Sequence, residues 1–298
     1  MKILCIGHAA YDITFPLDSF PVENTKNRVN GKVECGGGPS NNAAYLLGKW
    51  GMDVTFLGIV GKDLYGDKII EELKEIGIET KYMEQSEEHQ TTSSIIIANT
   101  SKGSRTILTY RPKTMKMKPV ELDFEPDIIL IDGQEVELSK EMIKKYPNAT
   151  SIIDAGRSTD EIIELCGMVN YVACSKEFAE NVTNKKMDYE KPNTLIEIYQ
   201  ELENKFKNNI VITLESKGSL YKDGQIKIMP SIKVTAKDST GAGDIFHGAF
   251  TYGIAKKWPI EKIVKVANVA GGISVTRIGS KSSMPTKEEM KSIVHDFE

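Results

Sequence analysis

The fold is decided by the stretch Asp238-Ser239-Thr240-Gly241-Ala242-Gly243-Asp244, which opens an apolar pattern at helical spacing: Ile245, Phe246, Ala249, Phe250 and Ile254. Gly241 and Gly243 carry no Cβ, so their backbone N–H groups can approach an anion closely. The helix that follows adds unpaired N–H donors and the positive end of its dipole. We therefore expect Gly241, Ala242 and Gly243 to form a cradle for a phosphate group.

Asp244 is the candidate catalytic base. An acidic residue in the first turn of a helix ordinarily stabilises the helix end. For a lone Asp, this capping role would be as good an explanation as a catalytic role. The glycines beside it change the balance, because a carboxylate next to a bound phosphate is repelled by it. Asp244 is better explained as the group that accepts the proton of an attacking hydroxyl.

A second glycine-rich stretch, Gly36-Gly37-Gly38-Pro39-Ser40-Asn41-Asn42-Ala43, also leads into a helical pattern. Glycines let the backbone approach a ligand, and the two amides offer donors and acceptors suited to polyol hydroxyls. The alternative is a tight turn. Asp12 follows the first predicted strand, at the sheet edge where open α/β sheets bind ligands, and could accept two sugar hydroxyls; a solvent-facing Asp is the alternative there.

Composition points to a small-molecule partner. The chain has 298 residues, 38 basic and 42 acidic side chains and a net charge of -4, and no basic block that would attract nucleic acid or membrane. The four cysteines lack metal-ligand or C-x-x-C spacing, which favours reduced, packed thiols. With no export or anchoring signal recognised, we expect a cytoplasmic protein.

Short apolar runs of strand length alternate with helical patterns along most of the chain. The predicted strands are 3–7, 55–60, 128–131, 152–154, 171–174 and 210–214. This alternation predicts an α/β fold with a mostly parallel central sheet covered by helices on both faces. The segments 12–35 and 91–112 are strand-like instead, with a hairpin turn at 101–104, and predict a small antiparallel sheet that acts as a lid.

The two glycine-rich motifs together resemble the signatures of the ribokinase/phosphofructokinase-B family of sugar kinases. The similarity covers essentially the whole chain, because Asp12, the hairpin, the segment 212–218 and the segment 267–272 fall where that family has corresponding pieces. It implies a single ribokinase-like domain over 1–298, with three α/β/α layers and a small β-sheet lid. It also implies transfer of the γ-phosphoryl group of ATP to a hydroxymethyl oxygen of a sugar, with Mg²⁺ as cofactor.

The same resemblance assigns roles to individual residues. Asp244 is the base, and Gly241, Ala242 and Gly243 form the anion hole. The sugar is held by Asp12, Gly37, Gly38 and Asn41. The nucleotide is bound by Ser175, Thr213, Ser216, Gly218 and Asn268, together with Gly241 and Gly243. A monovalent cation such as K⁺ is implied near Asp238 and Thr240.

Two positions depart from the family pattern. Glu177 stands one place early for a residue that holds Mg²⁺ through water, so Ser175 and Glu177 could instead be a helix cap and a first-turn acid. Ala10 replaces the Asn of ribokinases proper, which puts ribose in doubt. The hairpin resembles that of ketose kinases and favours a ketose, with Arg105 touching the substrate. Arg105, Arg111 and Lys113 could alternatively contact an anionic group on the substrate, or simply solvate the hairpin.

Other functions are compatible with parts of the same sequence. A nucleoside kinase of the same fold is the nearest alternative, and a non-catalytic sugar or nucleotide sensor is the alternative from another class; the presence of Asp244 and its glycines favours an enzyme. A dinucleotide-binding oxidoreductase is disfavoured because no G-x-G-x-x-G follows the first strand. We expect a homodimer that pairs the exposed edges of the two lids.

Overall fold

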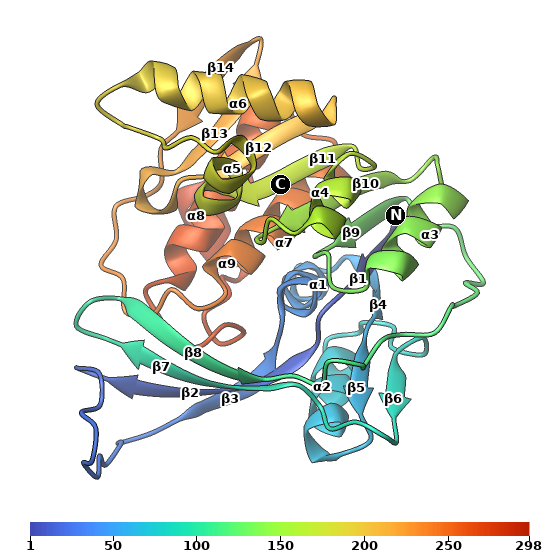
Figure 1. The fold of residues 1–298 in the computed structure, drawn as a ribbon, viewed down its shortest axis with the longest axis vertical. Helices are drawn as coiled ribbons and strands as arrows, with labels where there is room; N and C mark the ends of the chain where they lie inside the picture. Colours follow the sequence, from blue (N-terminus) through green and yellow to red (C-terminus); the bar gives the residue numbers. More distant parts are fainter. Residues whose placement is uncertain (298) are drawn as a thin grey trace.

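The computed structural model describes residues 1–297, and its centre is an eight-stranded sheet with the order β14-β13-β12-β11-β10-β9-β1-β4 (Figure 1). The strands from β12 to β4 are parallel, and only β13 and β14 run antiparallel to their neighbours. Their bounds are β1 Lys2–Ile6, β4 Asp53–Leu57, β9 Ile128–Ile131, β10 Thr150–Ala155, β11 Tyr171–Ser175, β12 Asn209–Thr213, β13 Ser219–Asp223 and β14 Gln225–Met229. The predicted mostly parallel sheet is confirmed.

Two hydrophobic cores lie on the two faces of this sheet. Alternate residues of β1 enter different cores: Ile3 and Cys5 join one, and Leu4 and Ile6 join the other. Because successive side chains of a strand point to opposite faces, a strand that is covered on both sides reads as a continuous apolar run. The first core is covered by α1 Pro39–Lys49, α2 Leu64–Glu75, α7 Ala242–Ala255, α8 Ile260–Ser274 and α9 Lys287–Ile293; the second by α3 Val136–Lys145, α4 Asp160–Cys166, α5 Lys176–Thr183 and α6 Pro192–Phe206.

A separate four-stranded sheet projects from one side of this domain (Figure 1). Its order is β3-β2-β7-β8, with β2 Ala10–Leu17, β3 Val33–Gly37, β7 Ser93–Asn99 and β8 Ser104–Tyr110. The expectation of a purely antiparallel sheet is wrong, because β2 and β7 pair in parallel. Both strands leave the main domain in the same direction, and each pairs with an antiparallel strand, β3 or β8. The hairpin turn predicted at 101–104 joins β7 to β8.

The register of the smaller sheet sorts its side chains onto two faces. Asp12 lies beside Ser94, Ser94 beside Thr109, and Ala98 beside Arg105, so these residues share the inner face. Asp12 and Ser94 are buried there. The outer face carries apolar side chains, among them Ile95, Leu108 and Tyr110. The inner face thus combines these polar residues with apolar ones such as Ile96 and Ile107, whereas the outer face presents exposed apolar side chains.

The run predicted as one strand at 55–60 is two strands, β4 and β5 Ile59–Gly61, and the second pairs with β6 Glu84–Ser86 in a two-stranded sheet. Gly58 separates them, and a Cβ there would lie 2.9 Å from the carbonyl oxygen of Gly7. The chain thus changes sheets where the backbone must pass close to β1. Within residues 1–297 no helix combines the length and apolarity needed to cross a membrane.

Candidate active site

Asp244 lies in the first turn of α7, a helix that packs against α1 and α8 and has most of its residues buried. Gly241 caps the helix in the left-handed region with φ 75°, and a Cβ there would lie 2.8 Å from the Cβ of Ser280. Gly243 is exposed and has open space on the side where a Cβ would stand. The N–H of Ala242 donates a long hydrogen bond of 3.4 Å to the carbonyl oxygen of Ser239. The open space beside Gly243 leaves room for an anion at the start of this helix.

Asn42, in the first turn and a half of α1, holds the carboxylate of Asp244. Its Nδ2 atom donates a hydrogen bond of 2.6 Å to Oδ2 of Asp244. Asn42 is buried, and its own Oδ1 atom accepts no hydrogen bond within the described part of the protein. The amide therefore orients Asp244 and stabilises its charged form.

His247 and Asp154 form a buried pair one helical turn beyond Asp244. The Nδ1 atom of His247 lies 2.9 Å from Oδ2 of Asp154, at the end of β10, and Nε2 lies 3.2 Å from the carbonyl oxygen of Ala173. Burial lowers the pKa of His247, but the carboxylates of Asp154 and Asp244 outweigh it and raise that pKa. Burial, and then Asp154, raise the pKa of Asp244, while Asn42, His247 and Arg105 oppose the rise.

The second glycine-rich stretch packs against Asp12 and His8. A Cβ on Gly37 would lie 2.0 Å from Oδ2 of Asp12, and a Cβ on Gly38 would lie 2.2 Å from the carbonyl oxygen of His8. Gly38 also has φ 102°, a conformation that favours glycine. Asn41 is fully buried, with Nδ2 bonded to the carbonyl of Gly37 at 3.1 Å and Oδ1 without a partner among the described residues. Glycine at 37 and 38 is thus required by close packing.

Asp12 lies on β2 of the smaller sheet and not at the end of a main-sheet strand. Burial raises its pKa to about 6, although a hydrogen bond from Ser94 opposes the rise; the charge of Asp244 raises it further. The two predicted carboxylates are therefore close enough to interact electrostatically. Asp12, Gly37, Asn41 and Asp244 are brought to one region of the molecule, where the smaller sheet meets the starts of α1 and α7.

The smaller sheet touches the loop before α7 at two points. Nη1 of Arg105 on β8 donates a hydrogen bond of 2.8 Å to Oγ of Ser239. At the hairpin turn, a Cβ on Gly103 would lie 2.6 Å from the Cβ of Ala236. The sheet is thus held against the predicted phosphate cradle, as a cover over the site requires.

Asp238 closes the loop that precedes α7. Its Oδ1 atom accepts hydrogen bonds from N and Oγ1 of Thr240 at 2.9 and 2.6 Å, and its Oδ2 atom accepts one of 2.8 Å from N of Gly279. The carboxylate is almost completely buried and therefore needs these donors. The monovalent cation assigned to Asp238 and Thr240 stays a prediction, and the contacts give both residues a structural role in the loop.

Ser175 and Glu177 occupy the start of α5 at the end of β11. The Ser175 hydroxyl accepts a hydrogen bond of 3.0 Å from N of Phe178, so it caps the helix. Glu177 is an exposed acid in the first turn. This geometry matches the alternative in which Ser175 is a helix cap and Glu177 a first-turn acid. The carboxylate of Glu177 is accessible, and contact between Glu177 and Mg²⁺ stays a prediction.

The residues predicted to bind the nucleotide lie along β12, the 3₁₀ turn Glu215–Lys217, β13 and α8. Thr213 ends β12, and Ser216 is exposed on the turn. Gly218 has φ 103°, and a Cβ there would lie 1.9 Å from the carbonyl oxygen of Met229. Asn268 accepts a hydrogen bond of 2.7 Å from Ser219 and donates one of 2.9 Å to the carbonyl of Met229. Gly218 and Asn268 therefore hold the β13–β14 hairpin in place beside this surface.

Sequence reasoning missed Asn42 and the pair of Asp154 and His247. Asn42 was noted only as one amide of the second motif, and its partner stands 202 positions away. His247 lies in α7, three positions after Asp244. Its spacing of one turn from Asp244 was the available signal, but Asp154 comes from a different strand and shares no local pattern with it.

Comparisons with known proteins identify the family to which the chain is similar. The sequence matches the family described as pfkB family carbohydrate kinase over residues 1–287. It is 25% identical over 311 residues to a ribokinase of Lactococcus lactis, covering 100% of this chain and 98% of that protein. It is 26% identical to a nucleoside kinase of Methanocaldococcus jannaschii, covering 97% and 95%. The structure of a ribokinase from Thermotoga maritima superposes with a TM-score of 0.83 at 23% identity, covering 99% of each chain. The chain belongs to the pfkB family of carbohydrate kinases.

Proposed function

We propose that this carbohydrate kinase transfers the γ-phosphoryl group of ATP to a hydroxymethyl oxygen of a sugar, with a ketose or ketose derivative as the acceptor. The observation that supports it most directly is the carboxylate of Asp244, held by Asn42 at 2.6 Å beside the open start of α7. This arrangement supports the proposal because it would set a base beside an anion cradle, as phosphoryl transfer to an alcohol requires.

In the proposed reaction, the acceptor oxygen attacks the γ-phosphorus and forms an O–P bond. The bond from phosphorus to the bridging β,γ-oxygen breaks, ADP leaves, and the hydroxyl proton passes to Asp244. The N–H groups of Gly241, Ala242 and Gly243 stabilise the negative charge of the phosphoryl group in flight. Because the transfer is largely dissociative, the position of the carboxylate matters more than its basicity.

The acceptor would be held by Asp12, Asn41 and the backbone of Gly37 and Gly38. Asn41 supports this role because its buried Oδ1 atom lacks a partner in the described chain and can accept a hydroxyl hydrogen. Arg105 would act on the phosphoryl group indirectly, through its hydrogen bond to Ser239 in the loop before α7. By covering the site, the smaller sheet would exclude the water that otherwise hydrolyses ATP.

ATP would lie along Ser175, Thr213, Ser216, Gly218 and Asn268, with its γ-phosphate at the start of α7. The exposed carboxylate of Glu177 is an oxygen ligand of the kind that Mg²⁺ accepts, directly or through water. Bound Mg²⁺ would offset the negative charge of the phosphates. K⁺ near Asp238 is not needed for any step above.

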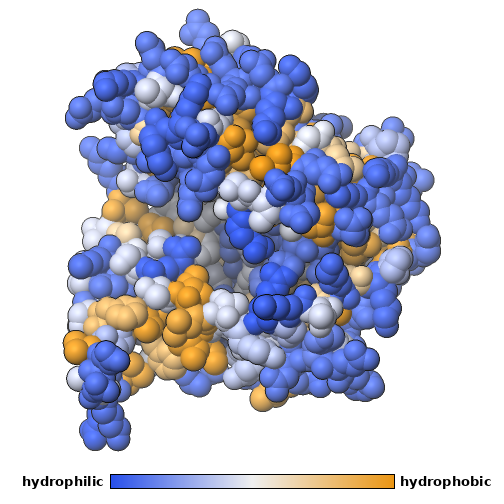
Figure 2. All heavy atoms as spheres, in the orientation of Figure 1, coloured by the Kyte–Doolittle hydropathy of each residue, from blue (hydrophilic) through white to orange (hydrophobic). Residues whose placement is uncertain are grey.

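We also propose a homodimer through the smaller sheets. All seven residues of β8, an edge strand, are exposed. On the outer face of the smaller sheet, Ile95, Leu108 and Tyr110 are 46, 61 and 55% exposed. Figure 2 shows apolar residues gathered over this sheet. An unpaired edge beside an apolar face would be covered by a second copy. A monomeric mass by light scattering at working concentrations would count against it.

The test is the variant Asp244→Asn with ATP, Mg²⁺ and a panel of ketoses, aldoses and nucleosides, measured as ADP release. Loss of the base should lower turnover by about 100- to 10,000-fold while ligand binding and the melting temperature persist. Asp160→Asn is the matched control, since Asp160 is also a first-turn acid, on α4. Near-normal activity of Asp244→Asn would refute the assignment, and a preference for nucleosides would favour the nucleoside kinase.

A further inference from the structure

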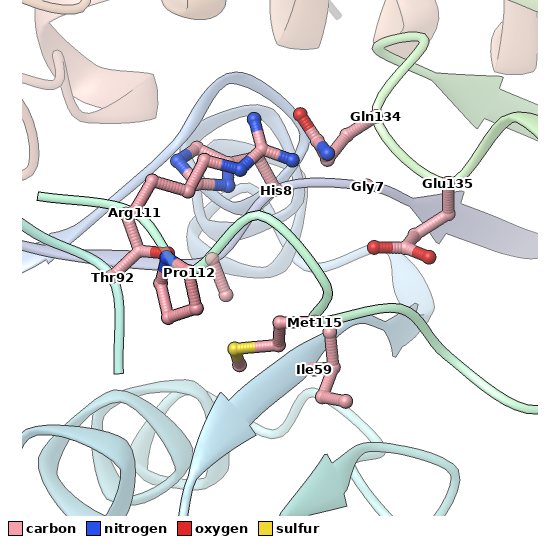
Figure 3. Close-up of a pocket in the computed structure, with 10 residues that line it drawn as sticks. Gly7, His8, Ile59, Thr92, Arg111, Pro112, Met115, Gln134 and Glu135 are labelled. Carbon is pink, nitrogen blue, oxygen red and sulfur yellow. The ribbon is translucent and has the colours of Figure 1, made fainter. Parts of the chain in front are cut away.

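A second, small hollow with a lining that is part polar and part apolar lies next to the predicted sugar site, and no step above uses it. It is lined by the backbone after β1, by the segment that follows β8 and by the segment after β9, including His8, Thr92, Arg111 and Gln134 (Figure 3). The three polar side chains His8, Arg111 and Gln134 gather on one side of this hollow in Figure 3, whereas Glu135 lies on the other. The hollow therefore has a cationic, hydrogen-bonding wall.

The guanidinium of Arg111 on this wall, and that of Arg157, which contacts the lining residue Gln134, have no counter-ion among the described residues. Within residues 1–297, neither Arg111 nor Arg157 has a carboxylate within ion-pairing distance, and the hydrogen bond found for the two is one of 3.3 Å from Nη2 of Arg157 to Gln134. Burial, and then the charge of Arg157, lower the pKa of Arg111. Two like charges, one of them half-buried, therefore repel each other across this wall.

The carboxylates nearest to these arginines are occupied elsewhere. Asp132 accepts hydrogen bonds from the backbone N–H groups of His8, Ser40 and Gln134 at 2.8, 3.1 and 2.9 Å. Glu135 accepts one of 3.1 Å from N of Met117. Both act on Arg111 only at longer range. Their contacts hold the walls of the hollow together and leave the guanidinium of Arg111 free for a ligand.

His8 adds a neutral donor or acceptor rather than a third charge. Burial, and then Arg111 and Arg157, lower its pKa to about 3, so it is uncharged at neutral pH. His8 also joins this hollow to the sugar-binding loop, because a Cβ on Gly38 would lie 2.2 Å from its carbonyl oxygen and 3.3 Å from its ring. A ligand held by the loop can therefore extend into the hollow.

We propose that the Arg111 hollow binds an anionic group of the acceptor, so that the physiological substrate is a polyhydroxylated compound that carries a carboxylate or a phosphate. The anionic group lies against Arg111, Arg157 and Gln134. The hydroxyl to be phosphorylated lies at Asp244, beyond the glycine loop and next to Asn42 of α1, which contacts that base. Guanidinium forks bind carboxylate and phosphate oxygens with paired hydrogen bonds, and an anion there would relieve the repulsion between the two arginines.

This inference rests on the proposed kinase function. It assigns the anionic group to Arg111 rather than to all three basic residues that the sequence offered. Of the three basic side chains that the sequence offered, Arg105 is bonded to Ser239 at the phosphate cradle and Lys113 is exposed on the connecting segment. Only Arg111 lines the hollow. Arg157, which no sequence motif singled out, comes to the same wall from the segment after β10.

The experiment combines binding and turnover. Isothermal titration calorimetry without ATP, and ADP release with ATP and Mg²⁺, would be measured for D-gluconate, D-galactonate, fructose 6-phosphate and the neutral sugars D-fructose and D-ribose. The variants are Arg111→Met, which keeps the apolar stem, and Arg157→Gln. Lys113→Met is the matched control, because it removes the same charge from an exposed neighbour. Melting temperatures would confirm that each variant folds.

We expect the wild-type protein to favour one anionic class over the neutral sugars by about 10- to 100-fold in kcat/KM. Arg111→Met should remove that preference, Arg157→Gln should reduce it, and Lys113→Met should keep it; whether the aldonates or the phosphosugar wins identifies the anion. If the wild-type protein phosphorylates neutral sugars without preferring anionic compounds, and Arg111→Met does so at the same rate, this inference is wrong and the kinase function stands. If an anionic compound binds only when Arg111 is present but no compound is phosphorylated, the anion site is confirmed and the proposed kinase function is refuted.

Discussion

Replacing Asn42 by Leu tests whether the candidate base depends on its amide partner. The substitution keeps the approximate volume and the helical position of the side chain but removes the donor of the 2.6 Å hydrogen bond to Oδ2 of Asp244. A hydrogen bond to a charged group is worth about 1.5–3 kcal/mol. If this stabilisation is fully expressed in the reactive arrangement, kcat falls by about 10- to 100-fold, since 1.4 kcal/mol corresponds to tenfold.

The pH dependence distinguishes this role from simple damage to the fold. Donation by Asn42 favours the charged carboxylate and so lowers the pKa of Asp244, against burial and Asp154, which raise it. Loss of the amide should therefore raise that pKa and move the acid limb of kcat/KM to higher pH. Part of the lost activity should then return as the pH increases.

The assay is ADP release from pH 5 to 9, with urea unfolding as the measure of stability. Asn209→Leu is the control, because the side chain of Asn209 donates a single hydrogen bond of 3.1 Å to the carbonyl of Asn170, at the start of β12. A variant at position 42 with wild-type kcat and an unmoved acid limb would refute the reasoning. An equal loss of activity in the control would show that the assay reports stability instead.

Two further predictions concern Asp12 and Gly218. Because burial raises the pKa of Asp12 to about 6, KM for the acceptor should rise as the pH falls from 7 to 5, since the protonated carboxyl accepts fewer hydroxyl hydrogens; a KM that stays flat over this range would contradict the assignment. Gly218→Ala should destabilise the fold by roughly 3 kcal/mol, from left-handed strain and a Cβ 1.9 Å from the carbonyl of Met229. Urea unfolding would measure it against Gly156→Ala, where a Cβ meets open space.

The main sheet could be predicted because its signal is local. Runs such as 128–131 and 210–214 are apolar at every position, and the structure shows why: their neighbouring residues enter different cores. The glycine-rich stretches could also be located, since each combines residues that only a tight backbone or a close ligand explains. Gly37 and Gly38 confirm the tight backbone, with Asp12 and His8 within contact of an added Cβ.

The direction of pairing in the smaller sheet was not predictable from the same patterns. Alternation of apolar and polar residues identifies a strand, but it is the same for parallel and antiparallel neighbours. A hairpin such as 101–104 fixes only the pair that it joins. The pairing of β2 with β7 follows from where both strands leave the main domain, which is a property of the whole topology.

The contact between Asn42 and Asp244 has a cause that neither motif contains. Helices α1 and α7 pack against each other, and a Cβ on Gly248 of α7 would lie 3.0 Å from the carbonyl oxygen of Ala43 on α1. Small residues at this crossing let the two backbones approach closely. Asp244 stands one turn before Gly248, and Asn42 stands next to Ala43, so the crossing sets their side chains at hydrogen-bonding distance. The geometry of the base therefore depends on Gly248, a glycine one turn away that lies outside both motifs. This explains why the motifs reveal the carboxylate but not the residue that holds it.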